Sequence, residues 1–254
     1  MADMNKQFLG PQYDTGKLVD AGASEIAENL SQWKPRKGDG GWPPALDIIG
    51  GAASRWSALL RAVYRMHTLG LDVETAKVLE VGSGFGDGLR PFLLAGFPPN
   101  HLTGIDLMPE RLKGAQNRLP GMNFVHGNAA EMQDNFGNGV FDIVCEQFCF
   151  CHIPDSEVKR KIAVEMVRVA KPGGFIFIHD WRINAPWRHI YGMPQSIIRQ
   201  MFRVGEATDR IVVFPSHLWP PIGNLISLWA LPLYQLCTSI PPLVGSKITV
   251  LRKR

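Results

Sequence analysis

A strand-like run of apolar residues leads into a turn of alternating glycines over residues 82–88. Glycines after a strand let the backbone approach a nucleotide-like ligand closely, because they carry no Cβ. A dinucleotide site requires the spacing G-x-G-x-x-G, whose third glycine would fall at position 87. Asp87 stands there instead, and its carboxylate and that of Glu80 would repel a pyrophosphate. The turn therefore favours a cationic or zwitterionic ligand, such as a nucleoside with a sulfonium and an amino-acid tail.

Polar residues also end the next predicted strands. Asp106 ends the second strand, 24 positions after Gly82. In a βαβ unit its carboxylate faces the glycine turn, where it can accept hydrogen bonds from both ribose hydroxyls. After the third strand, Asn128 offers an amide that complements the donor and acceptor groups of an adenine edge. The fourth strand, over 141–147, ends in polar groups beside the tail of this ligand, so we expect a nucleoside site along the strand ends.

These residues need a scaffold of alternating strands and helices. An amphipathic helix is predicted over 52–69 from apolar residues at three- and four-residue steps, namely Trp56, Leu59, Leu60, Val63 and Met66. Strands are predicted at 77–81, 102–106, 123–126, 141–146 and 174–180, with helices at 86–95, 109–118, 128–134 and 156–170. Strands near 210–214 and 247–251 close the sheet as a hairpin-like addition. The alternation predicts an α/β fold with a doubly wound, seven-stranded, mostly parallel sheet.

Five motifs in this order resemble those of the class I S-adenosylmethionine-dependent methyltransferases. The turn at 80–86 is similar to the first family motif, Asp106 to the acidic second-strand motif, and residues 127–129 to the adenine motif. The fourth strand and the helix-to-strand junction at 167–174 are also similar, so the resemblance covers residues 76–181. It implies a Rossmann-like fold, S-adenosylmethionine as cofactor, and methyl transfer. Segments from His179 onward are more weakly similar to bacterial methyltransferases of glycan and secondary metabolism.

The resemblance also implies roles for individual residues. Those near the methionine end of the cofactor would be Glu80, Gly82, Ser83, Gly84 and Glu146. Those near the ribose and the base would be Asp106, Leu107, Asn128 and Ala129.

Because the sulfonium methyl is already activated, the protein has to hold an acceptor in line with it in a dry, apolar pocket. A hydroxyl acceptor also needs a general base, and the candidates near strand ends are His152, His179 and Asp180. Strand alternation lets only one of His179 and Asp180 face a given side. A carboxylate or thiolate acceptor would need no base, and all three would then be binding or ordinary residues. We expect an apolar small-molecule acceptor, with oxygen favoured as the methylated atom.

Composition narrows the classes of partner. The net charge of +4 is small, and its one basic cluster, Lys247 with residues 252–254, is too thin to predict nucleic-acid binding. Four cysteines do not form a disulfide framework. Cys149, Cys151 and His152 lack the spacing of a zinc or haem site, so no metal is expected. The first 30 residues lack the apolar core of a signal peptide, which favours a cytoplasmic location.

Two segments outside the motifs leave alternatives open. Residues 1–50, with a helical pattern at 24–33 and the aromatics Tyr13, Trp33 and Trp42, are predicted to form a lid, and 51–254 the methyltransferase domain. The aromatics equally fit packing under a loop. Residues 211–246 contain no Asp, Glu, Lys or Arg, and prolines interrupt every window long enough to span a membrane. This segment fits strands and the wall of an apolar pocket, or an interfacial helix over 223–234 that contacts a membrane with help from the basic C-terminus.

Three competing functions follow. The first is methylation of a lipid-linked or membrane-associated acceptor, and the second is a non-catalytic module that binds the cofactor. The third is a nicotinamide-dependent oxidoreductase, which Asp87 disfavours. The acceptor, the methylated atom and the oligomeric state stay open at this stage.

Overall fold

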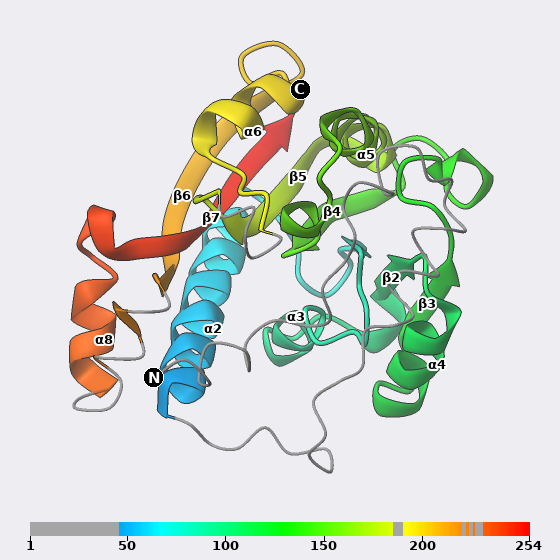
Figure 1. The fold of residues 1–254 in the computed structure, drawn as a ribbon. Coiled ribbons are helices and arrows are strands. Elements are labelled where there is room, and N and C mark those ends of the chain that lie inside the picture. Colours follow the sequence, from blue (N-terminus) through cyan, green and yellow to red (C-terminus); the bar gives the residue numbers. More distant parts are fainter. Residues whose placement is uncertain (1–45, 185–189, 220–221, 224–225, 227–230) are drawn as a thin grey trace.

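The structure is a computed structural model that describes residues 46–184, 190–219, 222–223, 226 and 231–254 (Figure 1). The predicted lid, including its helical pattern and Tyr13, Trp33 and Trp42, lies outside the described residues except for 46–50. The described chain begins with the helix α2, Leu46–His67, which precedes the first strand.

Seven strands form one sheet in the order β3-β2-β1-β4-β5-β7-β6. Their bounds are β1 Val78–Val81, β2 Leu102–Asp106, β3 Asn123–His126, β4 Phe141–Gln147, β5 Ala170–Trp181, β6 Thr208–Leu218 and β7 Val244–Lys253. The first five strands pair in parallel, and β7 runs antiparallel to both β5 and β6. The predicted doubly wound, mostly parallel sheet is confirmed. Because the strand order reverses between β1 and β4, their carboxyl ends border the crevice where such folds bind ligands.

The remaining helices are α3 Arg90–Leu94, α4 Pro109–Arg118, α5 Ser156–Val169, α6 Gln195–Met201 and α8 Leu231–Cys237. The carboxylate of Asp155 caps α5 by accepting from the N–H groups of Glu157 and Val158, at 2.7 and 3.3 Å. The helices predicted over 86–95 and 128–134 are shorter than expected, the second being a 3₁₀ turn at Met132–Asp134. Gly86 has a φ of 77°, so the residues before α3 belong to the glycine turn.

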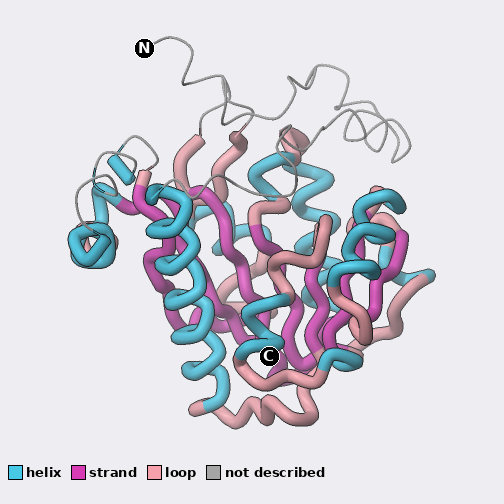
Figure 2. Tube along the Cα trace, turned by 90° about the horizontal axis from the view of Figure 1, so that it is seen from below, coloured by secondary structure: helices cyan, strands magenta, loops and turns pink. Residues whose placement is uncertain are grey.

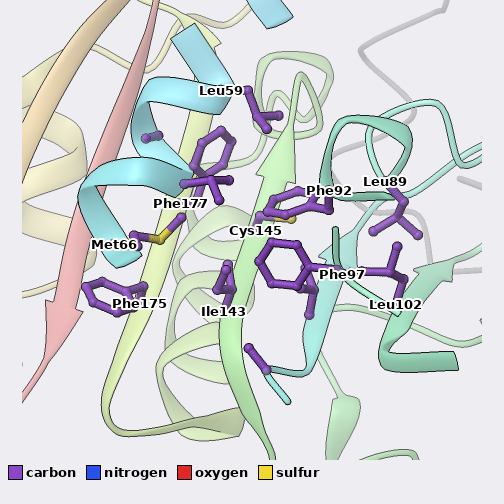
Figure 3. Packing of buried hydrophobic residues seen from close by; sticks show 14 of the residues in the cluster. Leu59, Met66, Leu89, Phe92, Phe97, Leu102, Ile143, Cys145, Phe175 and Phe177 are labelled. Atoms are coloured by element: carbon purple, nitrogen blue, oxygen red, sulfur yellow. The ribbon is translucent and has the colours of Figure 1, made fainter. Parts of the chain in front are cut away.

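Hydrophobic cores lie on both faces of the sheet, with helices on either side of the strands (Figure 2). On one face, Leu59 and Met66 of α2 and Phe92 of α3 pack with Phe177 of β5 (Figure 3). The rings of Phe92 and Phe177 meet edge to face with centroids 6.2 Å apart, a favourable aromatic arrangement. Helices α5 and α6 cover the other face. Since side chains alternate along a strand, successive residues at a strand end point toward opposite faces of the sheet.

The buried face of α2 is narrower than its sequence predicts. Leu59, Val63 and Met66 are buried, whereas Trp56 is 38% and Leu60 is 40% exposed. Two small residues, Ala58 and Ala62, are fully buried and let the helix backbone come close to the sheet. The contact therefore follows the Ala58–Ala62 side of the helix, and the prediction that Trp56 and Leu60 share the buried stripe was wrong.

The basic C-terminus is held at one end of the sheet. Arg254 pairs with Asp209 at 2.6 Å, and Lys253 Nζ donates to the Ala170 carbonyl at 2.8 Å. Helix α8 lies at the opposite end of β7 (Figure 1). The structure therefore separates Lys253 and Arg254 from the apolar segment that they were expected to assist, whereas Lys247 lies near the start of β7, on the side of α8. Within the described ranges, no helix is both long and apolar enough to span a membrane.

The short helix predicted over 223–234 lies partly outside the described residues. The helix α8 that the structure describes starts later, at Leu231. The hydroxyl of Tyr234 accepts from the N–H of Leu218 at 3.2 Å and so fastens α8 to the end of β6.

Candidate active site

The glycine turn follows β1 and lies against β2. The N–H groups of Gly82 and Ser83 both donate to the Ile105 carbonyl, at 2.9 and 3.1 Å. Gly82 and Gly84 have φ values of 67° and 52°, a region that glycine adopts without strain. A Cβ at Gly84 would meet no atom within 4 Å, whereas one at Gly82 would lie 2.5 Å from Cys149 Sγ. The turn is therefore open to close approach at Gly84 and covered by Cys149 at Gly82.

Asp106 ends β2 and binds the glycine turn. Its Oδ2 accepts from the Gly84 N–H at 2.8 Å, and its Oδ1 accepts from the Met108 N–H at 2.9 Å. The structure thus brings Asp106 and the turn together across adjacent strands. Each carboxylate oxygen has a second lone pair, so Asp106 can also accept hydrogen bonds from a ligand.

Leu107, Asn128 and Ala129 lie in the loops that follow β2 and β3. Asn128 Oδ1 accepts from the Ala130 N–H at 3.0 Å, which fixes its side chain in an Asx turn. His126 Nε2 hydrogen-bonds with the Leu107 carbonyl at 3.1 Å and ties the two loops together. Ala129 packs against the core on the α5 side. The three residues predicted to contact a base therefore lie on neighbouring loops at one edge of the sheet.

Glu80 is a buried carboxylate of β1, with 2% of its surface exposed. Its Oε1 accepts from Gln147 Nε2 at 3.2 Å, and the same nitrogen donates to the Gly88 carbonyl at 2.8 Å. A Cβ at Gly88 would overlap the Glu80 carboxylate, so this approach requires glycine. Burial raises the pKa of Glu80 to about 8, although the nearby Arg55 charge acts in the opposite direction. A cationic ligand group beside Glu80 would restore its charged form.

Helix α2 contributes Arg55, which the sequence reasoning missed. Its Nη2 donates to Gln147 Oε1 at 3.3 Å, and its guanidinium lies 5.8 Å from the centre of the Phe148 ring. Burial lowers the pKa of Arg55, against the attraction of Glu80. Arg55 precedes the buried Leu59 by four residues, which places it on the core-facing side of α2. A basic residue at a core-facing position was the signal that could have revealed it.

Buried side-chain atoms without a hydrogen-bond partner gather at this edge of the sheet. Among the described residues these are Arg55 Nε, Glu80 Oε2, Ser83 Oγ, Glu146 Oε1, both ring nitrogens of His179 and, elsewhere, His101 Nδ1. Leaving such an atom unsatisfied costs roughly 1–3 kcal/mol. Their concentration around the ends of β1, β4 and β5 is expected of a site that a polar ligand completes.

Known proteins share the fold that positions these residues. Residues 79–178 match the family described as a methyltransferase domain. The fold superimposes on that of the magnesium protoporphyrin IX methyltransferase from Synechocystis, solved with bound SAH, with a TM-score of 0.63 over 91% of this chain and 99% of that chain at 13% identity. Residues 79–178 therefore match a methyltransferase domain, within a Rossmann-like fold that the chain shares with the Synechocystis enzyme.

Curated relatives of this methyltransferase domain include the phthiotriol/phenolphthiotriol dimycocerosates methyltransferase of Mycobacterium tuberculosis, 32% identical over 127 residues. The fatty-acid O-methyltransferase of Mycolicibacterium smegmatis is 34% identical over 113 residues. These matches cover 48% and 44% of this chain, and the chain spans 44% and 39% of the two relatives. The family match includes the glycine turn, Asp106 and Asn128, whereas Arg55 lies outside it.

Two buried carboxylates of the methyltransferase domain hold the turn after β4. Glu146 Oε2 accepts from the Cys149 N–H at 2.9 Å, and Asp180 Oδ2 accepts from the Cys151 N–H at 2.8 Å. Burial raises the pKa of both carboxyls. His152 ends this turn and is exposed. The predicted cofactor contact of Glu146 and the predicted base roles of Asp180 and His152 stay predictions, and the geometry adds a structural role for the two carboxylates.

His179 lies on the opposite face of β5 from Asp180, as strand alternation requires. It is fully buried and stacks on His217 of β6, with ring centres 5.6 Å apart and planes 15° apart. The Phe148 ring lies 4.4 Å from that of His179. Burial lowers the pKa of His179 far below its usual value and that of His217 to about 3. Both imidazoles are therefore neutral at pH 7.

The surroundings of His179 come from three separate strand ends. Phe148 follows β4 with a φ of 59°, a left-handed conformation that is strained for a bulky residue. The Trp181 ring lies 5.5 Å from Phe148, and His217 Nδ1 hydrogen-bonds with Ser246 Oγ at 2.9 Å. We call Phe148, His179, Trp181 and His217 the aromatic group. The sequence gives no sign that Phe148 and His217 lie near His179, because only the order of the strands in the sheet brings them together.

Proposed function

We propose that this chain transfers a methyl group from S-adenosylmethionine to an apolar small-molecule acceptor, with oxygen favoured, by in-line displacement. One observation carries the proposal. The open backbone at Gly84, the Asp106 carboxylate and the unpartnered atoms of Glu80 and Arg55 meet at the ends of β1, β2 and β4. A zwitterionic nucleoside supplies what these groups lack, namely ribose hydroxyls for Asp106 and an ammonium for Glu80.

The residues fit this cofactor along its length. Gly84 would lie against the methionine part, Asp106 would bind the ribose, and Asn128 with the adjacent Leu107 and Ala129 would contact the base. The bound sulfonium supplies an already activated methyl group. The chain itself then has to orient an acceptor toward the turn and exclude water from the gap. The residues that surround Glu80 are buried, which favours the exclusion of water.

We assign the acceptor to the aromatic group. Its rings offer an apolar surface, and the substrates after which the two curated relatives are named, phthiotriol dimycocerosates and a fatty acid, are apolar. Among the three candidate bases we select His179, because both its ring nitrogens are without partners while both Asp180 oxygens accept from backbone N–H groups. Its low pKa makes it a weak base, which suits a hydroxyl proton that becomes acidic as the new C–O bond forms.

The test has two stages. Titration calorimetry with S-adenosylhomocysteine measures whether the cofactor site exists, and absence of binding would overturn the proposal. Incubation with methyl-deuterated S-adenosylmethionine and a panel of fatty acids, long-chain alcohols, phenols and hydroquinones then detects the labelled product by mass spectrometry. Cofactor binding without any labelled product would favour the non-catalytic binding module.

A second candidate function, methylation of a lipid-linked or membrane-associated acceptor, is favoured by two exposed apolar stripes. On α2, Trp56, Leu60 and Tyr64 recur every four residues and are exposed, Tyr64 to 69%. On and just after α8, which contacts α2, the exposed large apolar residues are Leu233, Leu236 and Ile240. Exposed arginines at positions 61 and 65 flank the α2 stripe. Apolar groups beside cations suit an anionic lipid surface.

Co-sedimentation with anionic and zwitterionic phospholipid vesicles tests this second candidate. We expect binding to anionic vesicles that Tyr64→Ser and Leu236→Ser together weaken at least fivefold. Val164 is an exposed apolar residue of α5, on the other side of the sheet, and Val164→Ser is the matched control. Equal vesicle binding by the double variant and the control would remove the support for this function.

A further inference from the structure

Four successive N–H groups of the turn after β4 donate to acceptors on β4 and β5. The first, that of Phe148, donates to the His179 carbonyl at 2.8 Å. The next two donate to Glu146 Oε2 at 2.9 and 3.4 Å, and the fourth donates to Asp180 Oδ2 at 2.8 Å. The backbone over 148–151 is therefore held to two neighbouring strands at each of its residues.

This anchoring fixes the side chain of Phe148. Its φ of 59° is strained for a bulky residue, and the four hydrogen bonds hold the backbone in that conformation. The Phe148 ring lies 4.4, 5.5 and 5.6 Å from the rings of His179, Trp181 and His217. Phe148 thus contacts each of the other members of the aromatic group, in which the acceptor is proposed to bind.

The rings around His179 leave little space. Both of its ring nitrogens are buried and without a hydrogen-bond partner, so an acceptor oxygen reaches them only where a covering ring gives way. The nearest covering ring is Phe148, which lies in a turn and not in a strand. A ring sandwiched between two others needs about 7 Å between their centres, twice the contact distance of carbon atoms. The distances from His179 to Phe148 and to His217, 4.4 and 5.6 Å, are both shorter.

We propose that Phe148 selects the acceptor by its shape, and that Glu146 and Asp180 are positioning residues that act through the backbone of the turn. The inference rests on the proposed methyl transfer at the aromatic group and narrows the class of acceptor. The end of an aliphatic chain is narrow in two directions and needs only a small displacement of the Phe148 ring. A phenol or hydroquinone is narrow in one direction and needs a larger displacement. The site therefore prefers fatty acids and long-chain alcohols to aromatic alcohols.

The two carboxylates hold the turn in different ways. Asp180 uses both oxygens, because Oδ2 accepts from the Cys151 N–H and Oδ1 accepts from the Trp181 N–H at 2.7 Å. An amide has only one oxygen, so asparagine at this position would turn its NH₂ group toward one of these donors. Glu146 holds its two N–H groups with Oε2 alone, and its Oε1 has no hydrogen-bond partner. Glutamine at position 146 can therefore keep both contacts.

The experiment is a competition between decanoic acid, decanol and hexylphenol at equal concentrations, with methyl-deuterated S-adenosylmethionine. Mass spectrometry of the labelled products gives the ratio of kcat/KM values. We expect wild type to form at least about tenfold more aliphatic than aromatic product, and Phe148→Ala to bring the ratio within about threefold of one. Phe214→Ala is the matched control and should keep the wild-type ratio, because Phe214 is also partly buried and stacks on an arginine of α2, Arg61 at 5.3 Å.

The positioning residues are tested by the same ratio. Asp180→Asn should lower the preference for aliphatic acceptors at least about threefold, whereas Glu146→Gln should keep it. Glu165→Gln is the control, since Glu165 is a buried carboxylate that accepts from a backbone N–H elsewhere, that of Met132 at 2.7 Å. A loss of preference in both Asp180→Asn and Glu146→Gln would assign the effect to the lost charge and remove the positioning role.

The ratio separates selection from a loss of structure, because less folded protein lowers all products together. An unchanged ratio in Phe148→Ala, or the loss of every product, would overturn the selection by shape, and Phe148→Leu should shift the ratio in the same direction as a milder change. An unchanged ratio in Asp180→Asn, or an equal change in Glu165→Gln, would overturn the positioning role. Wild type that prefers hexylphenol would overturn this inference alone. Wild type that binds no S-adenosylhomocysteine, or forms no labelled product, would overturn the proposed function as well.

Discussion

Replacing Asp106 by alanine tests the connection between β2 and the glycine turn. The carboxylate is 8% exposed and accepts from the Gly84 N–H at 2.8 Å and the Met108 N–H at 2.9 Å. A hydrogen bond that involves a charged group contributes about 1.5–3 kcal/mol. The contributions of the two hydrogen bonds are not fully additive, because both are made by the same carboxylate and because water can partly replace the carboxylate as acceptor for the two N–H groups. We therefore expect Asp106→Ala to lower the free energy of unfolding by about 2–4 kcal/mol.

The same change should weaken cofactor binding. If the carboxylate also accepts from the ribose hydroxyls, its loss removes at least about 1.5 kcal/mol of binding free energy, or roughly a tenfold rise in Kd. Urea denaturation measures the first quantity. Calorimetry with S-adenosylhomocysteine, at a temperature where circular dichroism shows the variant folded, measures the second.

Asp87→Asn is the matched control because it removes one carboxylate from the same turn. The Asp87 side chain is 56% exposed and pairs with Arg90 at 3.5 Å and with Arg118 at 4.0 Å. Exposed ion pairs of this kind contribute about 0–1 kcal/mol. An Asp106→Ala protein as stable as wild type, or an Asp87→Asn protein destabilised equally, would refute the reasoning. Unchanged cofactor affinity in Asp106→Ala would refute the ribose assignment.

Three other perturbations have definite expected outcomes. Gly82→Ala places a Cβ 2.5 Å from Cys149 Sγ, whereas a Cβ at Gly70, which also has a positive φ, meets no atom within 4 Å. Urea denaturation should therefore show that Gly82→Ala lowers the free energy of unfolding by about 1–3 kcal/mol more than Gly70→Ala does. Equal losses of stability in the two variants would contradict the clash. Burial raises the pKa of Glu146 in the folded state, so its contribution to stability falls as pH rises from its unfolded value toward the folded one. The free energy of unfolding of Glu146→Gln, measured relative to wild type by urea denaturation, should therefore be higher at pH 8 than at pH 5. The opposite pH dependence would contradict a buried neutral carboxyl at Glu146. His179→Phe should lower kcat for a hydroxyl acceptor by at least about a hundredfold and leave the affinity for S-adenosylhomocysteine unchanged; a normal rate would exclude His179 as the base.

Local signals predicted much of the scaffold. The strands at 102–106 and 123–126 and the helix at 109–118 have the expected bounds. A proline at the first position of α4 predicts where this helix begins, and short apolar runs between turns predict the two strands. Both signals depend only on residues that are close in the sequence. The predicted start of the helix over 86–95 was wrong, because Gly86 has a positive φ and the glycine turn extends into the range that was predicted to be helical.

The groups near the glycine turn were also predictable from local position. Asp106 is the last residue of β2 and Asn128 lies two residues after β3, and because the strands are parallel, their carboxyl ends lie at the same edge of the sheet. Which atoms those side chains bind was not predictable. Glu146 could be placed near the site from its position in β4, but only the folded turn shows its carboxylate on the backbone of Cys149.

The sequence by itself therefore determined a methyltransferase domain with a glycine turn suited to a sulfonium nucleoside, because that information lies in strand-end residues and their order along the chain. Tertiary structure alone decided that Arg55 reaches Gln147 across 92 residues and that His217 stacks on His179. Those contacts depend on how α2 packs on the sheet and on the placement of β6 beside β7, which nonlocal burial selects. The contact between Arg55 and Gln147 and the rings of the aromatic group are properties of that packing.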